Sequence, residues 1–285
     1  SAFYPSPFTE AAVLTMDGVG EWATTTIGYG HGSDLQIYEE VLYPHSLGLL
    51  YSAFTYYCGF KVNSGEYKLM GLAAYGEPKY AEIIQKELVD VRPDGSYRLN
   101  GEYFGFIDST IMTNDKFHKL LGGEPRSPET RITQREMDIA ASIQQVLEDA
   151  VLLLGRRAKE LTNSSNLVLV GGVALNCVAN GKLLKSGLFD SIWIQPASGD
   201  SGASLGCALL AVHQHFGVDR VPNDVRDSQK GSYLGPSFTN AEIKAFLEYH
   251  ETILEYQNVF LEYEEAFLEY EEAFLEYQET FLEYQ

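Results

Sequence analysis

Short apolar runs separated by glycine-rich turns occupy the first part of the chain. Residues 11–16 are mostly apolar and end in Asp17-Gly18-Val19-Gly20. Residues 21–27 and 35–43 are rich in strand-forming residues and flank a second glycine cluster at 28–32. Strand formers bounded by glycine turns predict three consecutive β-strands.

Apolar residues at helical spacing follow. Residues 46–60, 66–75 and 79–89 predict three helices, and glycine or proline marks the end of the first two. Residues 90–132 are interrupted by Gly and Pro and contain short strand-like fragments at 96–99 and 103–107. We interpret 90–132 as an insertion or as a cap over a site.

The second half alternates helices with apolar strands. Thr133 and Glu136 have the spacing of a capping box, which predicts a long helix through about Leu161. Strands are predicted at 167–170 and 191–194, and helices at 173–185 and 203–216. This alternation predicts an α/β fold with parallel strand pairing. An early strand–DGxG–strand and a late strand–Gly-Gly–helix further suggest two related halves facing one cleft.

Residues 246–285 repeat every seven positions around the letters Phe-Leu-Glu-Tyr. An apolar residue repeated every seven positions is typical of a coiled coil. Here the repeated apolar residues are mainly aromatic, and the 12 Glu of the segment have no Lys or Arg to pair with. A lone helix, self-association through 246–285 and disorder all remain open. We predict two domains, a body at 1–245 and this acidic tail at 246–285, which is either natural or an artefact of the gene model.

Composition and charge exclude several classes of protein. The chain has 20 basic and 40 acidic residues, a net charge of −20, and is 45% hydrophobic. Residues 1–245 hold all 20 basic and 28 of the acidic residues, a net charge of −8. Such a chain is a poor ligand for nucleic acid or an anionic membrane, so we expect neither as a partner. Three widely spaced cysteines argue against a disulfide framework and favour a cytoplasmic setting.

Three loops that follow predicted strands carry candidate chemistry. Asp17 with Gly18 and Gly20 can turn tightly and present a carboxylate to a metal or a hydroxyl, although DG is also a common turn. Gly171-Gly172 can bring an anion close to the start of the next helix. Asn176, near that start, either reaches a ligand or caps the helix. Asp200 either caps the helix that follows it or binds a metal or the hydroxyl of a ligand. Because ligands bind at the carboxyl ends of strands in α/β folds, we expect the three loops to converge.

Six segments resemble the amino-terminal domain of the O-carbamoyltransferases, a family that includes enzymes modifying nodulation factors, aminoglycosides and cephalosporins. They are residues 1–8, 14–22, 45–51, 63–76, 171–176 and 199–206, in the family's order. Residues 233–238 resemble the entry to the family's carboxyl-terminal domain. The resemblance implies an actin-like ATPase fold, a duplicated ribonuclease H-like architecture shared with the tRNA threonylcarbamoyl-transferases.

The resemblance also implies a reaction. The family makes carbamoyl adenylate from carbamoyl phosphate and ATP in its carboxyl-terminal domain, and its amino-terminal domain transfers the carbamoyl group to a small-molecule or sugar hydroxyl with an iron-type metal. On this resemblance Asp17 would be the catalytic base. Asp17 and Asp200 would be metal ligands, and Asp108 would hold the acceptor. The residues expected to bind the adenylate are Gly18, Gly20, Glu66, Lys68, Gly171, Gly172 and Asn176.

The sequence departs from the family at both ends. The histidine pair that supplies metal ligands would precede Ser1, and the heptad tail follows where the activating domain would begin. We therefore expect a fragment with little or no overall activity. Two alternatives remain open: a non-catalytic remnant that binds nucleotide or only folds, and an actin-like sugar kinase.

Overall fold

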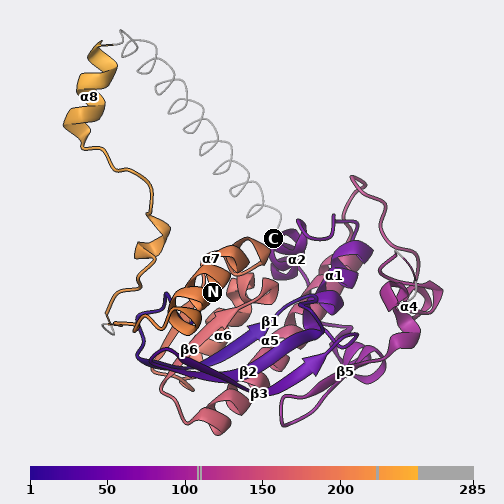
Figure 1. The fold of residues 1–285 in the computed structure, drawn as a ribbon. Coiled ribbons are helices and arrows are strands. Elements are labelled where there is room, and N and C mark those ends of the chain that lie inside the picture. The colour runs from indigo at the N-terminus through magenta and orange to yellow at the C-terminus, as the bar shows by residue number, and fades with distance from the viewer. Residues whose placement is uncertain (108, 110, 223–224, 250–285) are drawn as a thin grey trace. The chain divides into compact units, whose positions relative to one another are not determined.

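The computed structural model describes residues 1–107, 109, 111–222 and 225–249, and the chain divides into two compact units, Ser1–Tyr233 and Leu234–Gln285. The first unit is an α/β structure around a five-stranded sheet (Figure 1). The sheet strands are β1 (Glu10–Met16), β2 (Ala23–His31), β3 (Asp34–Leu42), β6 (Asn166–Val170) and β7 (Ser191–Ile194). The helices of this unit are α1 (Leu47–Tyr57), α2 (Glu66–Leu72), α3 (Ala81–Ile83), α4 (Asp115–Leu120), α5 (Gln134–Thr162), α6 (Cys177–Lys185) and α7 (Ala203–Leu210).

The strands lie in the order β3-β2-β1-β6-β7. β1, β2 and β3 pair antiparallel, as consecutive strands with short turns do, whereas β6 is parallel to both β1 and β7. The five strands predicted at 11–16, 21–27, 35–43, 167–170 and 191–194, and the parallel pairing, are therefore confirmed. The expectation of two related halves is wrong for the described residues. Val13 of β1 pairs with Val168 of β6. The DGxG motif that follows β1 and the Gly-Gly motif that follows β6 therefore belong to neighbouring strands of one sheet.

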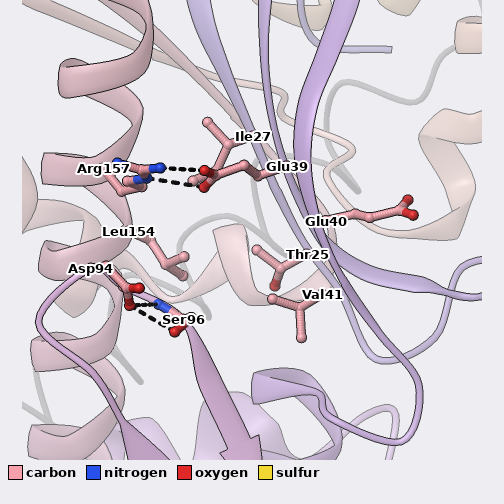
Figure 2. Close-up of a pocket in the computed structure, with 10 residues that line it drawn as sticks. Thr25, Ile27, Glu39, Glu40, Val41, Asp94, Ser96, Leu154 and Arg157 are labelled. Atoms are coloured by element: carbon pink, nitrogen blue, oxygen red, sulfur yellow. Dashed lines mark hydrogen bonds and ion pairs between the residues drawn. The ribbon is translucent and has the colours of Figure 1, made fainter.

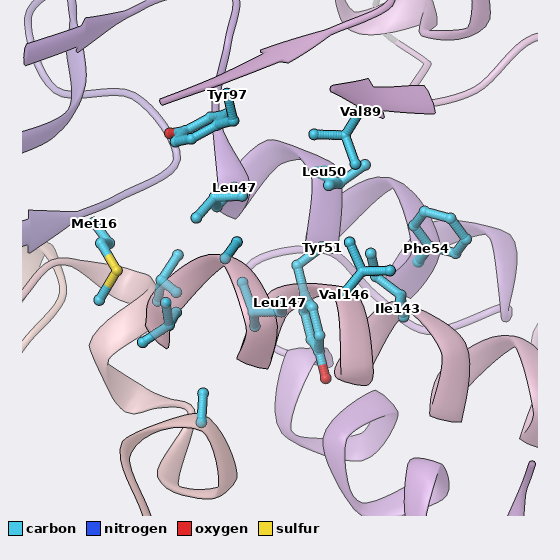
Figure 3. Close-up of a cluster of buried hydrophobic side chains, with 14 of the residues drawn as sticks. Met16, Leu47, Leu50, Tyr51, Phe54, Val89, Tyr97, Ile143, Val146 and Leu147 are labelled. Atoms are coloured by element: carbon cyan, nitrogen blue, oxygen red, sulfur yellow. The ribbon is translucent and has the colours of Figure 1, made fainter. Parts of the chain in front are cut away.

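Successive side chains of β1 point to opposite faces of the sheet, and each face is covered by an apolar layer. Ala12, Leu14 and Met16 face the larger core, in which side chains of α1 and α5 pack (Figure 3). Ala11 and Val13 face the opposite layer, where residues 2–8 of the chain and Leu209 cover the sheet. β1 and β6 are thus buried on both faces of the sheet, which explains why β6 is apolar without alternation.

The 29-residue helix α5 forms the centre of the larger layer. Its predicted capping box is present, with Thr133 at the N-cap and Glu136 bonded back to the Thr133 amide at 2.9 Å. Gly155 lets α6 approach closely, because a Cβ there would lie 2.5 Å from Leu183 Cδ1. α5 therefore joins the sheet to α6, the helix that follows the Gly-Gly turn.

The region 90–132 is partly as predicted. A hairpin of β4 (Val89–Val91) and β5 (Tyr97–Leu99) includes the first strand fragment. The strand predicted at 103–107 is wrong: two 3₁₀ turns, η3 (Gly101–Tyr103) and η4 (Gly105–Ile107), occupy this stretch, and Asn100 caps the first. Helix α4 was not predicted. Asp108, the predicted acceptor residue, lies outside the described residues.

The second unit contains helix α8 (Asn240–Tyr249), which begins with a reciprocal pairing of Thr239 and Glu242. The rest of the heptad segment, residues 250–285, lies outside the described part. Within the described residues, no helix combines the length and apolarity that a membrane span requires.

Candidate functional site

The loops that follow β1, β6 and β7 meet at one edge of the sheet. These three strands run parallel, so their carboxyl ends lie on the same side. The Gly172 amide donates to Asp17 Oδ1 at 3.2 Å, and the Gly171 amide donates to the Ser198 carbonyl at 2.9 Å. The predicted convergence of the three loops is confirmed, although the binding roles of their residues stay predictions.

The Asp17 loop is held by the sheet and by the start of α1. Its backbone amide donates to the Thr24 carbonyl at 2.8 Å, which keeps the turn on the β1–β2 hairpin. Ser46 caps α1 by accepting from the Leu49 amide at 3.0 Å, and its hydroxyl donates to the Asp17 carbonyl at 2.9 Å. A Cβ at Gly48 would lie 2.6 Å from the same carbonyl oxygen. Ser46 and Gly48 therefore position Asp17, and sequence analysis did not assign either residue to the site.

Gly171 allows β6 to turn against β1. Its φ of 98° lies in the left-handed region, and a Cβ there would lie 2.1 Å from the Met16 carbonyl oxygen. Gly172 follows in η5 (Gly172–Leu175), where a Cβ would be 3.3 Å from Asp17 Oδ1. The Gly-Gly pair thus brings one backbone amide to the Asp17 carboxylate. A side chain at Gly171 would clash with the Met16 carbonyl, and one at Gly172 would press against the carboxylate.

Asp17 is half-buried, and its Oδ1 accepts from two backbone amides, those of Gly18 at 2.8 Å and Gly172 at 3.2 Å. Asp200 begins the short turn η6 (Asp200–Gly202) with an exposed side chain, two residues beyond Ser198. In the part of the chain that the structure describes, no group of three or more His, Cys, Asp or Glu side chains is placed to hold a metal. Because iron favours imidazole and several ligands, the described residues alone do not make an iron site.

Asn176 is buried and serves α6 as its N-cap, one of the two roles expected for it. Its Oδ1 accepts from the Ala179 amide at 3.0 Å. Its amide group also pairs reciprocally with the Gln144 amide at 2.9 and 3.0 Å, and Tyr51 donates to Gln144 at 2.9 Å. Burial raises the pKa of Tyr51, so its hydroxyl stays a donor. These bonds engage both ends of the Asn176 amide inside the protein.

Glu66 and Lys68 lie on the first turn of α2. The Glu66 carboxylate accepts from the Asn63 and Gly65 amides at 3.0 and 3.1 Å and from the Ser52 hydroxyl at 2.9 Å, so it closes its own loop against α1. Lys68 is exposed. None of the hydrogen bonds between described residues connects either side chain to Asp17 or Gly172.

A cavity of about 410 Å³ lies elsewhere, between β2, β3, α5 and the β4–β5 turn (Figure 2). It is lined by Thr25, Ile27, Glu39, Glu40, Val41, Asp94, Gly95, Ser96, Leu154 and Arg157. Arg157 Nε lies 3.0 Å from Glu39 Oε2, and a second contact joins the same two groups. The hydrogen bond to Glu39 raises the pKa of Arg157 above its already high usual value. None of the predicted site residues that the structure describes lines this cavity.

The chain matches a protein family described as "Carbamoyltransferase N-terminus" over residues 1–209. An uncharacterized protein of Synechocystis is 59% identical over 248 residues, covering 87% of this chain and 40% of that protein. Nodulation protein NolNO of Sinorhizobium fredii is 37% identical over 74% of this chain and 29% of its own length. Nodulation protein NolO of Bradyrhizobium diazoefficiens is 38% identical over 74% of this chain and 36% of its own length. The chain thus spans well under half of these relatives.

Proposed function

This chain belongs to the carbamoyltransferase family, in the part described as its amino terminus, and from that premise we propose that it is the part that binds carbamoyl adenylate for transfer of the carbamoyl group to a small-molecule or sugar hydroxyl, with little or no overall activity by itself. The observation that carries the proposal is the meeting of the Gly172 amide with the Asp17 carboxylate at the carboxyl edge of parallel strands. The strand order, with an antiparallel β2 beside parallel β1, β6 and β7, supports assigning this unit to a ribonuclease H-like half of an actin-like fold.

The chemistry suits backbone amides and a carboxylate. The acceptor oxygen attacks the carbamoyl carbon, the bond from that carbon to the phosphate oxygen breaks, and AMP leaves. Backbone amides at a glycine turn can hold the leaving phosphate without a covalent step. The proton of the acceptor hydroxyl passes to a base, and we assign this role to Asp17, which lies beside those amides.

The proposal keeps Asp17 and Asp200 as candidate ligands of a divalent metal such as iron(II), with further ligands supplied from outside the described residues. A metal bound there would polarise the carbamoyl carbonyl or stabilise the phosphate. We assign Gly18, Gly20, Gly171 and Gly172 to the adenylate. Asn176 would support this site as a buried cap rather than by direct contact, given its bonds to Gln144 and Ala179.

Calorimetry with a sulfamoyl-adenosine analogue of carbamoyl adenylate tests the proposal. The purified chain should bind this analogue in preference to adenosine, and the enthalpy change should disappear with Asp17→Ala. Lys185→Ala, on the last turn of α6, serves as the control. An analogue that produces no heat with the wild-type chain, or binds the Asp17→Ala variant equally well, would refute the assignment.

A further inference from the structure

The cavity between β2, β3, α5 and the β4–β5 turn takes no part in the proposed reaction (Figure 2). Its volume of about 410 Å³ falls in the range of sites that hold small molecules, roughly 300–1,000 Å³. The loops that carry Asp17, Gly171 and Asp200 do not line it. The cavity can therefore hold a ligand other than the carbamoyl donor.

The backbone sets both walls of this cavity. Two register shifts in the pairing of β2 with β3 bracket the stretch from Thr25 to Ile27, which supplies the β2 side of the wall. Such irregularities bend a strand and change the direction of its side chains. On the other wall, the β4–β5 turn packs closely on α5. A Cβ at Gly95, which has a φ of 83°, would lie 3.1 Å from the Leu153 carbonyl oxygen. The opening is thus a built feature of the fold.

Much of the wall is apolar. Ile27 and Val41 from the sheet and Leu154 from α5 line the cavity, and Ile27 and Leu154 are buried. Thr25 is also buried, and its hydroxyl already pairs with the Tyr97 hydroxyl at 2.8 Å. Apolar surface of a ligand would therefore be removed from water here, which favours binding.

The charge around the cavity is negative. Arg157 contacts Glu39 through Nε and Nη2, and its Nη1 lies 3.5 Å from Glu160. Glu40 also lines the cavity, although Figure 2 shows its carboxylate directed away from the Arg157–Glu39 pair. An anionic ligand would find the guanidinium already paired and would be repelled by the carboxylates around it.

Asp94 supplies a carboxylate that a ligand can reach. Its Oδ1 accepts from the Ser96 amide at 2.9 Å and from the Ser96 hydroxyl at 2.7 Å, whereas none of the hydrogen bonds between described residues engages Oδ2. The bonds from Ser96 lower the pKa of Asp94, so the group is ionised at neutral pH. We propose that the cavity binds a primary amine with a compact apolar body. The ammonium group pairs with Asp94 Oδ2, and the body packs against Ile27 and Leu154.

Calorimetry with 2-phenylethylamine tests the proposal, and 3-phenylpropionate, of similar size and opposite charge, is the comparison. We expect the amine to bind and the carboxylate to produce no heat. Asp94→Asn can still accept from Ser96, so it should fold and bind the amine roughly threefold more weakly, as for an exposed ion pair. Asp90→Asn is the matched control, because this carboxylate of the same hairpin pairs with Arg92 and does not line the cavity. Val41→Phe fills part of the cavity without a change of charge and should abolish binding.

Four results would overturn the proposal. Equal affinity of the wild type and Asp94→Asn would show that this carboxylate does not select the ligand. Unchanged binding to Val41→Phe would place the amine outside the cavity. Preferential binding of 3-phenylpropionate would assign an anion to Arg157, and binding of neither probe would identify the cavity as a solvent-filled hollow only. The assay contains no carbamoyl phosphate, ATP or adenylate, so its outcome is independent of the proposed function.

Discussion

The backbone amide of Gly172 lies 3.2 Å from Oδ1 of Asp17 and joins two loops that are 155 residues apart in the chain. The amide of Gly18 donates to the same oxygen at 2.8 Å. One carboxylate oxygen thus connects the ends of β1 and β6. This arrangement makes the carboxylate sensitive to small changes in the Gly-Gly turn.

Gly172→Ala should weaken adenylate binding without unfolding the protein. Gly172 does not have a positive φ, and its added methyl group would lie 3.3 Å from Asp17 Oδ1, so the carboxylate must shift by a few tenths of an ångström. We expect a change in unfolding free energy below about 1 kcal/mol and an affinity for the sulfamoyl analogue roughly tenfold lower, about 1.4 kcal/mol. Calorimetry measures the second effect. An unchanged affinity would place the ligand away from this turn.

Gly171→Ala should instead act on folding. Its methyl group would lie 2.1 Å from the Met16 carbonyl oxygen, and the backbone has a φ of 98°. We expect a loss of roughly 3 kcal/mol or failure to fold, measured by urea denaturation. Gly181→Ala is the control, because nothing lies within 4 Å of its added Cβ and it sits inside α6, where alanine should add about 0.5–1 kcal/mol. Equal effects of the two substitutions would contradict this account.

The sequence predicted the meeting of Asp17 with the Gly-Gly turn because both follow strands, and parallel strands end at a common edge. It could not predict that Ser46 and Gly48 hold Asp17, since this depends on how α1 packs on the β1–β2 turn. It also left the role of Asn176 open, because a cap and a ligand-binding amide share one sequence pattern. Gln144, 32 residues away, pairs with both ends of the amide and so supports the role as a buried cap, while ligand contact stays a prediction.

Local signals failed where tertiary contacts decide the conformation. Residues 103–107 have strand-forming side chains, but Gly101 and Gly105 permit 3₁₀ turns, and a single bridge between Phe104 and Thr113 replaces a strand. The idea of two halves failed because residues 11–16 and 167–170 are separated by 150 residues of sequence yet pair directly in one sheet. Periodicity predicts each strand, but it does not indicate which strands are neighbours.

Asn176→Ala should destabilise the protein through loss of a cap and of a buried amide pair. The substitution removes the acceptor for the Ala179 amide and leaves the buried Gln144 amide without its reciprocal partner. We expect a loss of about 2 kcal/mol in chemical denaturation. Val178→Ala, on the same helix and 46% exposed, should change stability by no more than about 0.5 kcal/mol. If Asn176→Ala kept full stability and lost only ligand affinity, direct ligand contact would be its role.

Asp138→Asn should change how stability depends on pH. The Glu77 amide, the Lys79 ammonium and the Gln134 amide donate to the Asp138 carboxylate, and they lower its pKa to about 2. A carboxyl with a lower pKa in the folded state stabilises the fold above its unfolded pKa of about 3.9, and that contribution is lost as the pH falls from about 5 to about 2. At pH 7 the variant should be less stable by about 2 kcal/mol, and the difference should shrink towards zero near pH 2. Urea denaturation at several pH values measures this difference. Lys79→Gln removes the cation and keeps the hydrogen bond from the Glu77 amide, so it should lose a smaller part of the stability that the Asp138 carboxylate contributes at pH 7. Parallel stability curves for the wild type and Asp138→Asn between pH 2 and 7 would show that these donors do not stabilise the carboxylate.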